Sequence, residues 1–410
     1  MNVLWLTDGL PYPADAGSRI RDFHLIREVA RTSTVHLFSL VLPGEPTEPG
    51  QLREFCKSIE IFVLPGFLSR RQLGSFLRSI LARRPLAAFP FCCAEAIHRL
   101  QAIMAREKID VFQVEHSLLA AYIDATPRKG ACRTVLSLHN VCFEQYRQMA
   151  RLDVGLAART LYRLKAIAMS KAERHYIPRF DCCVVVSAAE HELLQREVPE
   201  ARTVVIENGV DCSQLRPLPE SPGSGLLFVG VMGYPPNCDG LMFFARSILP
   251  RIRSSVPDAK LFVVGQAPPA RVKALGRKTG IEVTGYVNDI LPYYRLSKVT
   301  VVPLRAGGGT RLKILESMAL GRAVVSTTIG CAGLEVRHGV HLLIADGPQQ
   351  FADCVVQLLR NDALRAELVG NARRMVEERY DWANIGGQLA LAHREIVAGA
   401  PPLGQRSAHL

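Results

Sequence analysis

One stretch of the chain indicates the fold most directly, Val301-Val-Pro-Leu-Arg-Ala-Gly-Gly-Gly-Thr-Arg-Leu-Lys-Ile-Leu-Glu-Ser-Met-Ala-Leu-Gly321. It reads as a buried strand that ends near Pro303, a loop of three glycines, and a helix from about Thr310 to Gly321. Such an arrangement binds anions, because free N–H groups at the helix N-terminus point outward and the helix dipole favours negative charge there. The stretch therefore predicts an α/β fold with a phosphate site at a strand end.

Charged side chains in this predicted helix suit a nucleotide. Arg311 and Lys313 lie in the first turn, where positive charge is unfavourable for the dipole unless a phosphate lies between them and the loop. Glu316 follows one turn later and could accept hydrogen bonds from ribose hydroxyls. The alternative is a tight turn with a solvated arginine and lysine. The chain lacks G-x-x-x-x-G-K-[ST], and it lacks G-x-G-x-x-G after the first strand, which disfavours an ATPase and a dinucleotide dehydrogenase.

Short apolar runs recur along the whole chain, separated by stretches with helical spacing. Many of these runs are apolar throughout rather than alternating, which is typical of parallel strands covered by helices on both faces. We therefore expect an α/β protein with two doubly wound Rossmann-like domains. The expected strands are Val3–Thr7, Val35–Val41, Ile59–Leu64, Val111–Glu115, Thr134–His139, Cys183–Ser187, Val204–Glu207, Leu226–Gly230, Leu261–Gly265, Ile281–Val287, Val299–Leu304, Ala323–Thr327 and His341–Ala345.

A linker divides the chain into two similar halves. Residues 216–225 contain three prolines and two glycines, which suit neither a helix nor a strand. We expect domains at 1–215 and 225–379, each large enough for its own sheet. The cleft between two such sheets, at the carboxyl ends of their strands, is the expected ligand site. A further helix is expected at 380–397.

Composition restricts the class of protein. The 410 residues are 48% hydrophobic and 21% charged, which suits two or three globular domains. Eleven cysteines without a C-x-x-C pair, and an N-terminus without a basic leader, favour a reducing cytoplasmic location. The net charge of +12 suits anionic partners, although a basic soluble enzyme would look the same. No nucleic-acid partner is expected, because the basic residues are dispersed and no binding signature occurs.

Residues 307–346 resemble the donor-binding core of the retaining group 1 (family four) glycosyltransferases, in the sequence GGGTRLKILESMALGRAVVSTTIGCAGLEVRHGVHLLIAD. Further segments resemble motifs of the family in the expected order: Asp8–Pro13 with Gly17–Arg19, Glu207–Asp211, Phe228–Gly230, Val263–Gly265, Thr284–Val287 and Tyr380–Trp382. The resemblance covers nearly the whole chain. It implies two Rossmann-like domains facing across a cleft (the glycosyltransferase B-type fold), with the helix at 380–397 packing back on the first. It also implies transfer of a hexose from a UDP- or GDP-linked sugar.

The resemblance places the donor mainly in the second domain. No D-x-D motif occurs, so we expect no metal and no other cofactor at the diphosphate. The first of two glutamates that the family often carries eight positions apart falls on Gly308, and residues 231–240 contain no basic residue. Arg311 and Lys313 are therefore expected to neutralise the diphosphate, and Asn237 to cap the next helix. The expected donor-binding residues are Gly17, Gly230, Gly265, Tyr286, Val287, Gly308, Gly309, Thr310, Arg311, Lys313 and Glu316.

In the first domain, His139 ends a predicted strand. The resemblance implies that it lies near the donor sugar and the leaving phosphate, so it is an expected catalytic residue together with Arg311 and Lys313. The alternative is a structural histidine. The expected acceptor contacts are Arg19, Glu115, His116 and Asn140, although Arg19 could equally meet a phosphate or be solvated.

Residues Phe67–Pro85 form a basic segment with five arginines, no acidic residue and an apolar stripe at helical spacing. A basic amphipathic helix can lie on an anionic membrane, which would favour a lipid-linked acceptor and a peripheral position on the inner face of the cell membrane. The alternative is that the stripe packs on the first domain.

The sequence therefore predicts a glycosyltransferase that uses a saccharide or lipid-linked acceptor in cell-surface polysaccharide synthesis. The alternative is a nucleotide-sugar epimerase or hydrolase of the same two-domain build, which would need a carboxylate base near the sugar. The sequence leaves open the sugar, the base, the acceptor and the oligomeric state.

Overall fold

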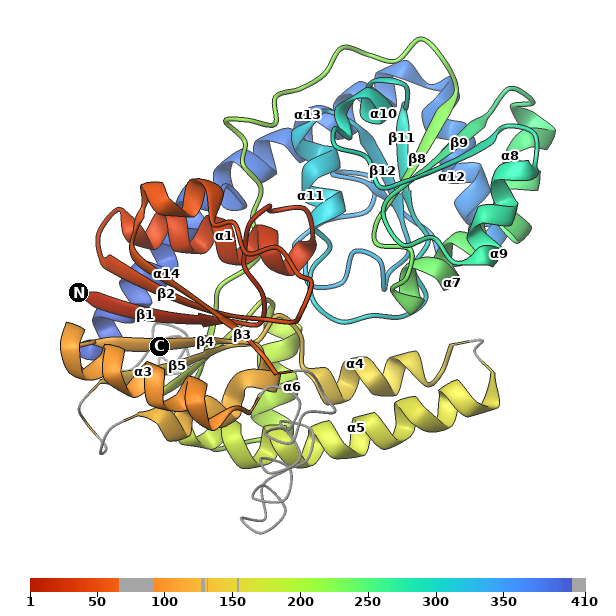
Figure 1. Cartoon of the computed structure of the whole chain (residues 1–410). Helices are drawn as coiled ribbons and strands as arrows, with labels where there is room; N and C mark the ends of the chain where they lie inside the picture. The colour runs from red at the N-terminus through yellow and green to blue at the C-terminus, as the bar shows by residue number, and fades with distance from the viewer. Residues whose placement is uncertain (66–91, 127–129, 131, 153–154, 400–410) are drawn as a thin grey trace. The chain divides into compact units, whose positions relative to one another are not determined.

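The computed structural model describes residues 1–65, 92–126, 130, 132–152 and 155–399. They form two compact units, each built around a sheet (Figure 1). The first unit comprises Met1–Arg147, Thr160–Asn208 and the chain from Trp382 onward, and the second comprises Gln148–Arg159 and Gly209–Asp381. The units part at Asn208–Gly209, so residues 216–225 belong to the second unit.

The first unit contains a seven-stranded parallel sheet in the order β3-β2-β1-β4-β5-β6-β7. The order reverses between β1 and β4, and in such sheets ligands bind outside the carboxyl ends of the strands at this point. The strands are β1 Asn2–Thr7, β2 Thr34–Val41, β3 Cys56–Val63, β4 Val111–Glu115, β5 Arg133–Ser137, β6 Cys182–Val185 and β7 Thr203–Val205. The helices are α1 Gly17–Ala30, η1 Gly50–Glu54, α3 Ala94–Glu107, η3 Ser117–Ala125, α4 Cys142–Met149, α5 Leu156–Tyr176, η4 Ile177–Arg179, α6 Ala188–Glu197 and α14 Trp382–Val397, with the end of α4 and the start of α5 falling in the second unit.

The second unit contains a six-stranded parallel sheet in the order β10-β9-β8-β11-β12-β13. Its order reverses between β8 and β11, directly before the glycine loop. The strands are β8 Gly225–Val229, β9 Lys260–Val264, β10 Ile281–Gly285, β11 Val299–Val302, β12 Ala323–Ser326 and β13 Leu343–Ile344. The helices are α7 Pro235–Phe243, η5 Phe244–Ile248, α8 Leu249–Ser255, α9 Ala270–Lys273, η6 Ala274–Arg277, α10 Leu291–Arg295, α11 Leu312–Ala319, α12 Pro348–Arg360 and α13 Asp362–Arg379.

The prediction of two parallel α/β sheets is confirmed. The apolar runs become strands because both faces of each sheet are covered: β1 and β11, for example, are almost wholly buried. Each sheet contributes to its own hydrophobic core.

The last helix, α14, belongs to the first unit and packs against α1. Gly386 allows the close approach, because a Cβ there would lie 2.2 Å from Cβ of Glu28. Trp382 stacks on His24 with ring centroids 5.2 Å apart. The buried face of α14, which includes His393, thereby packs against the rest of the first unit.

The predicted membrane segment Phe67–Pro85 lies outside the described residues. Among the residues that are described, no helix has both the length and the apolar character needed to cross a bilayer.

Candidate functional site

In the second unit, three glycines lie where neighbouring strands end. Gly230 follows β8 and donates to Val264 O, while Gly265 follows β9 and donates to Gly285 O, both at 3.0 Å. Gly230 has φ +156° and Gly265 has φ +144°, and a Cβ on Gly265 would lie only 1.9 Å from Gly230 O. Glycine is required for this close approach of backbone to backbone. The result is a narrow shelf of bare backbone at the carboxyl edge of the sheet.

Lys313 on α11 extends to this shelf. Its Nζ lies 2.8 Å from the position that a Cβ on Gly230 would occupy, donates to Asn237 Oδ1 at 2.9 Å, and lies 5.0 Å from the ring centroid of Phe228. Asn237 in turn donates through Nδ2 to Val231 O at 3.0 Å. The amine is therefore held against the strand end by a fixed partner, although Lys313 remains half-buried rather than sealed.

Asn237 does not cap α7, contrary to expectation. The helix begins with Pro235 and its cap position is Tyr234, which makes no side-chain cap bond. Pro235 and Pro236 start the helix early because their fixed φ suits the first helical positions. Asn237 is left inside the first turn, where its amide orients Lys313.

The glycine loop precedes α11. Gly307 has φ +121° and Gly309 has φ +69°, conformations that favour glycine. The Arg311 guanidinium donates to Gly308 O, so this side chain braces the loop. Gly308 and Gly309 are half-buried, whereas Thr310 is buried. At the far end of the helix Gly321 has φ +68°, as expected of a glycine that ends a helix.

Burial, together with the charge of Arg311, lowers the pKa of Lys313 to about 7, while Glu316 opposes the shift. Burial also raises the pKa of Glu316, while Lys313 opposes this rise. A phosphate beside Lys313 would favour the charged amine. The remaining predicted donor residues, Tyr286 and Val287, follow β10: Tyr286 is 56% exposed, and Val287 packs on a neighbouring apolar cluster.

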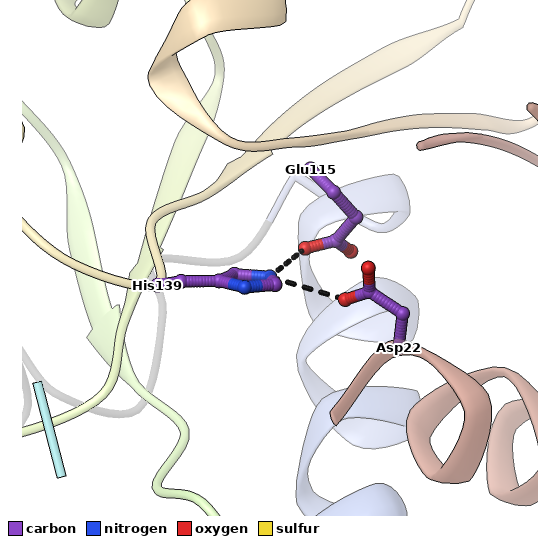
Figure 2. A group of neighbouring side chains, drawn as sticks. All are labelled: Asp22, Glu115 and His139. Carbon is purple, nitrogen blue, oxygen red and sulfur yellow. Dashed lines mark hydrogen bonds and ion pairs between the residues drawn. The ribbon is translucent and has the colours of Figure 1, made fainter. Parts of the chain in front are cut away.

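In the first unit, three charged side chains meet beside the β1–β4 reversal. His139 Nε2 lies 3.0 Å from Glu115 Oε2 and 3.1 Å from Asp22 Oδ1 (Figure 2). Glu115 ends β4, His139 follows the neighbouring β5, and Asp22 comes from α1. All three are buried, with exposed fractions of 8% or less. Because both carboxylates contact Nε2, only Nδ1 of His139 is left to bond anything else.

This cluster keeps His139 charged. Burial disfavours the imidazolium, but Asp22 and Glu115 outweigh it and raise the pKa of His139 to about 10. Burial raises the pKa of Asp22 to about 7. Burial would also raise the pKa of Glu115, but the hydrogen bond and the charge of His139 prevail and lower it. At neutral pH the cluster is an ionised Glu115 bonded to an imidazolium, which can donate but cannot act as a base.

Side chains of these types can also bind metal ions, and one ligand atom from each lies within 4.8 Å of the others. In this arrangement, however, His139 Nε2 itself lies at hydrogen-bond distance from one carboxylate and in contact with the other. A cation bound there would have to displace the ring proton from Nε2. In the structure the cluster is a group of opposite charges, with His139 Nε2 between the two carboxylates.

Glu115 was expected to contact the acceptor, but its carboxylate is fully buried and bonded on both oxygens, by Gln113 and His139. In this position its carboxylate bonds to His139 Nε2. The ring of His116, the next residue, lies 4.6 Å from that of His139 between centroids, and its backbone has φ +73°. Asn140 is half-buried beside His139. These two residues remain candidates for acceptor contacts.

The other predicted residues of the first unit lie at the start of α1. Gly17 is its first residue, and Arg19 forms an ion pair with Asp15 at 3.2 Å. The structure thus places His139, Glu115 and His116 together in the first unit. It places Gly230, Gly265 and Lys313 together in the second.

The sequence analysis did not identify Asp22, Gln113, His393 or the bond between Asn237 and Lys313. A signal existed for His393, which lies on the apolar face of α14 with Leu389 and Ile396, at the spacing i, i+4, i+7. Asp22 similarly lies among buried residues of α1. Charged or polar residues on a buried helix face point to a buried polar partner.

Two family models match the chain. Residues 223–361 match the model for glycosyl transferases group 1, and residues 24–214 match that for glycosyltransferase family 4. An uncharacterised 44.6 kDa protein in the cps region of Klebsiella pneumoniae is 23% identical over 92% of this chain and 96% of its own. A phosphatidyl-myo-inositol mannosyltransferase of Mycobacterium leprae is 28% identical over 50% of this chain and 56% of its own.

Solved structures share the fold at low sequence identity. Sucrose-phosphate synthase of Thermosynechococcus elongatus has a TM-score of 0.71 at 18% identity, covering 98% of this chain and 100% of its own. The Anabaena protein HepE, in complex with UDP and glucose, has a TM-score of 0.66 at 15% identity, covering 95% of this chain and 98% of its own.

Proposed function

Because the chain belongs to the group 1 (family four) glycosyltransferases, we propose that it transfers a hexose from a nucleoside diphosphate to a saccharide or lipid-linked acceptor, with retention of configuration. The observation that carries the proposal is the position of Lys313: a positive group held against the bare backbone at the ends of β8 and β9, beside a glycine loop and the start of α11. This set of groups suits a diphosphate.

In this reaction the bond from the sugar to the diphosphate breaks, and its electron pair stays on the phosphate oxygen. The ammonium of Lys313 and the N–H groups at the start of α11 stabilise the charge that develops there. Glu316, on the same helix, accepts hydrogen bonds from the ribose. Since these groups neutralise the diphosphate, the proposed mechanism requires no divalent metal.

His139 contributes from the first unit. As an imidazolium whose Nε2 is held by Glu115 and Asp22, it offers Nδ1–H as a charged donor to the sugar or the leaving phosphate. A charged donor suits the departure of an anion and does not suit proton abstraction. An epimerase would need a carboxylate base at the sugar, and the position at which the resemblance would put a glutamate is Gly308 in this chain. Transfer is therefore favoured over epimerisation.

The relatives support a cell-surface role. One is encoded in a cps region and another acts on a phosphatidylinositol, which suits a polysaccharide product and a lipid-linked acceptor. HepE binds UDP and glucose, which makes a UDP-linked hexose the first donor to test, with GDP-linked sugars next.

A face of α5 supports contact with an anionic lipid surface. Leu161, Leu164 and Ile167 are 50%, 60% and 57% exposed, and basic residues Arg163 and Lys165 lie among them. Exposed apolar side chains within positive charge fit an acidic membrane surface. Vesicles with anionic lipid should sediment the protein at low salt and release it as salt rises. Leu164→Glu with Ile167→Glu should abolish sedimentation, and an unaffected double variant would exclude this face.

Calorimetry with UDP, GDP, ADP and TDP tests the donor site. One nucleoside diphosphate should bind, and Lys313→Met should weaken it at least about tenfold, because a charge-assisted contact is worth roughly 1.5–3 kcal/mol. Lys273→Met is a matched control, since Lys273 is an exposed lysine of the same unit. If Lys313→Met and Lys273→Met bind the nucleoside diphosphate equally well, the phosphate does not contact Lys313.

A further inference from the structure

A line of buried hydrogen bonds connects the C-terminal helix to His139. His393 Nε2 on α14 contacts Gln113 Oε1 at 2.5 Å, and Gln113 Nε2 donates to Glu115 Oε1 at 2.7 Å. The other oxygen of Glu115 accepts from His139 Nε2 at 3.0 Å. His393, Gln113 and Glu115 have no exposed surface. All four residues belong to the first unit, although His393 lies 280 positions from Gln113 in sequence.

The donors in this line all point toward Glu115. An ionised carboxylate only accepts, so Gln113 must present its amide nitrogen to Glu115 and its oxygen to His393. His393 must then carry its proton on Nε2 and donate it to Gln113. Its Nδ1 has no partner among the described residues, which suits an unprotonated nitrogen better than an orphaned N–H. Burial lowers the pKa of His393 to about 4, so the ring is neutral.

This direction has a consequence for His139. If Gln113 reversed its amide, its oxygen would face the Glu115 carboxylate and repel it. His393 prevents the reversal, because a donor from α14 holds the amide oxygen. Glu115 is thereby kept ionised and correctly placed to fix the Nε2 side of His139, in the way that carboxylates orient histidines in other sites.

We propose that His393 is a positioning residue for His139, acting from the C-terminal helix through Gln113 and Glu115. Helix α14 therefore does more than pack on α1: through His393 it orients the residues that keep His139 charged. The expected effect of His393 on turnover rests on the proposed function of His139. The expected effect of His393 on the pKa of His139 does not.

Charged and titratable groups approach His139 from several elements of the first unit. Asp22 on α1 and Glu115 on β4 contact it, His116 lies beside it, and Asp8 after β1 acts on Asp22 and His116 through its charge. Arg21 interacts with Glu115 but is bonded to Asn208 and nearby backbone oxygens. None of these charged groups replaces the donor that Gln113 supplies to Glu115, and the hydroxyl of Ser137 is the further group that favours the ionised form of Glu115.

The test uses two substitutions of His393. One keeps an aromatic ring without the N–H donor, and the other keeps an N–H donor without the ring. His393→Phe keeps an aromatic ring against Trp5, whose centroid lies 6.2 Å away, but removes the N–H. His393→Gln loses the ring but restores a donor near Nε2. His36→Phe is the matched control, because His36 is another buried histidine of the first unit, bonded to Ser58 rather than to this line.

Two measurements on the full chain decide the outcome. In histidine-labelled protein, the NMR titration of His139 (assigned with His139→Asn) should move to lower pH by about one unit in His393→Phe. With donor and acceptor, kcat should fall about fivefold while KM for the donor stays within about twofold, as expected for one lost hydrogen bond acting on the transition state. His393→Gln should restore both quantities, and His36→Phe should change neither.

An unchanged His139 titration in folded His393→Phe overturns the proposal, as does an equal effect of His36→Phe. If His393→Phe fails to fold, Gln113→Met breaks the same line and must give the same shift. If the wild-type enzyme turns over no nucleotide sugar, the proposed function fails, and the titration alone still judges the role of His393.

Discussion

Raising the pH should weaken the binding of a nucleoside diphosphate through Lys313. Burial holds the pKa of the free amine at about 7, well below its ordinary value. A phosphate beside Nζ favours the ammonium and returns the pKa toward its usual range. Binding therefore takes up a proton, and affinity falls as pH rises above about 7. The phosphate contributes little to this change, because its last ionisation near pH 6 is complete.

The size of the effect follows from linkage. With a free pKa of about 7, the amine is about 90% neutral at pH 8, so binding there should take up about 0.9 proton. Between pH 7 and pH 9 the affinity should fall by at most about fifty-fold, or ~2.3 kcal/mol. The true loss is smaller if solvent screens the half-buried amine.

Calorimetry at pH 8 in two buffers of different ionisation enthalpy measures the proton uptake directly. Wild type and the Lys273→Met control should take up the proton, and Lys313→Met should not. The free protein offers a second readout: because the depressed pKa destabilises the charged amine, the unfolding free energy of the wild type should rise relative to that of Lys313→Met as pH rises from about 7 toward the unfolded value of about 10.4, and this difference removes the opposite contribution of His139. Proton uptake that persists in Lys313→Met would refute the reasoning.

Three further predictions concern the same site. Glu316→Gln should weaken nucleoside diphosphate binding but leave inorganic pyrophosphate binding unchanged, because the pyrophosphate has no ribose; equal losses for both ligands in calorimetry would reject the ribose contact. Turnover should survive excess EDTA, and a complete loss reversed by added metal would overturn the metal-free mechanism. Gly265→Ala should destabilise the chain by roughly 1–3 kcal/mol in denaturant unfolding, since φ is +144° and the new Cβ would meet Gly230 O; unchanged stability would show that the shelf can relax.

Much of the fold was predictable because its signal is local. Strands buried on both faces appear as continuous apolar runs, and every predicted run overlaps a strand, although several strands are shorter than predicted or begin at other residues. The meeting of Glu115 and His139 also follows from local reasoning, since each lies at the carboxyl end of one of two neighbouring strands. The glycine loop and the end of α11 at Gly321 were visible for the same reason.

The rest depends on packing between distant segments. Asp22 reaches His139 only because α1 covers the sheet, and His393 reaches Gln113 only because α14 packs on α1. The bond from Lys313 to Asn237 joins residues 76 positions apart, and it requires α7 to begin at Pro235. Residue spacing carries no information on such pairs, so the sequence showed the acids and bases but not their partners.

The central claim is that this chain transfers a sugar from a nucleoside diphosphate. The most direct measurement follows nucleotide release and product formation from a panel of UDP- and GDP-linked hexoses, with saccharide and lipid-linked acceptors, and reads the anomeric configuration of the product by NMR. We predict acceptor-dependent release with one donor, a product that retains the configuration of that donor, and loss of both in Lys313→Met. Release of an epimerised or free sugar without transfer, or full turnover by Lys313→Met, would contradict this account.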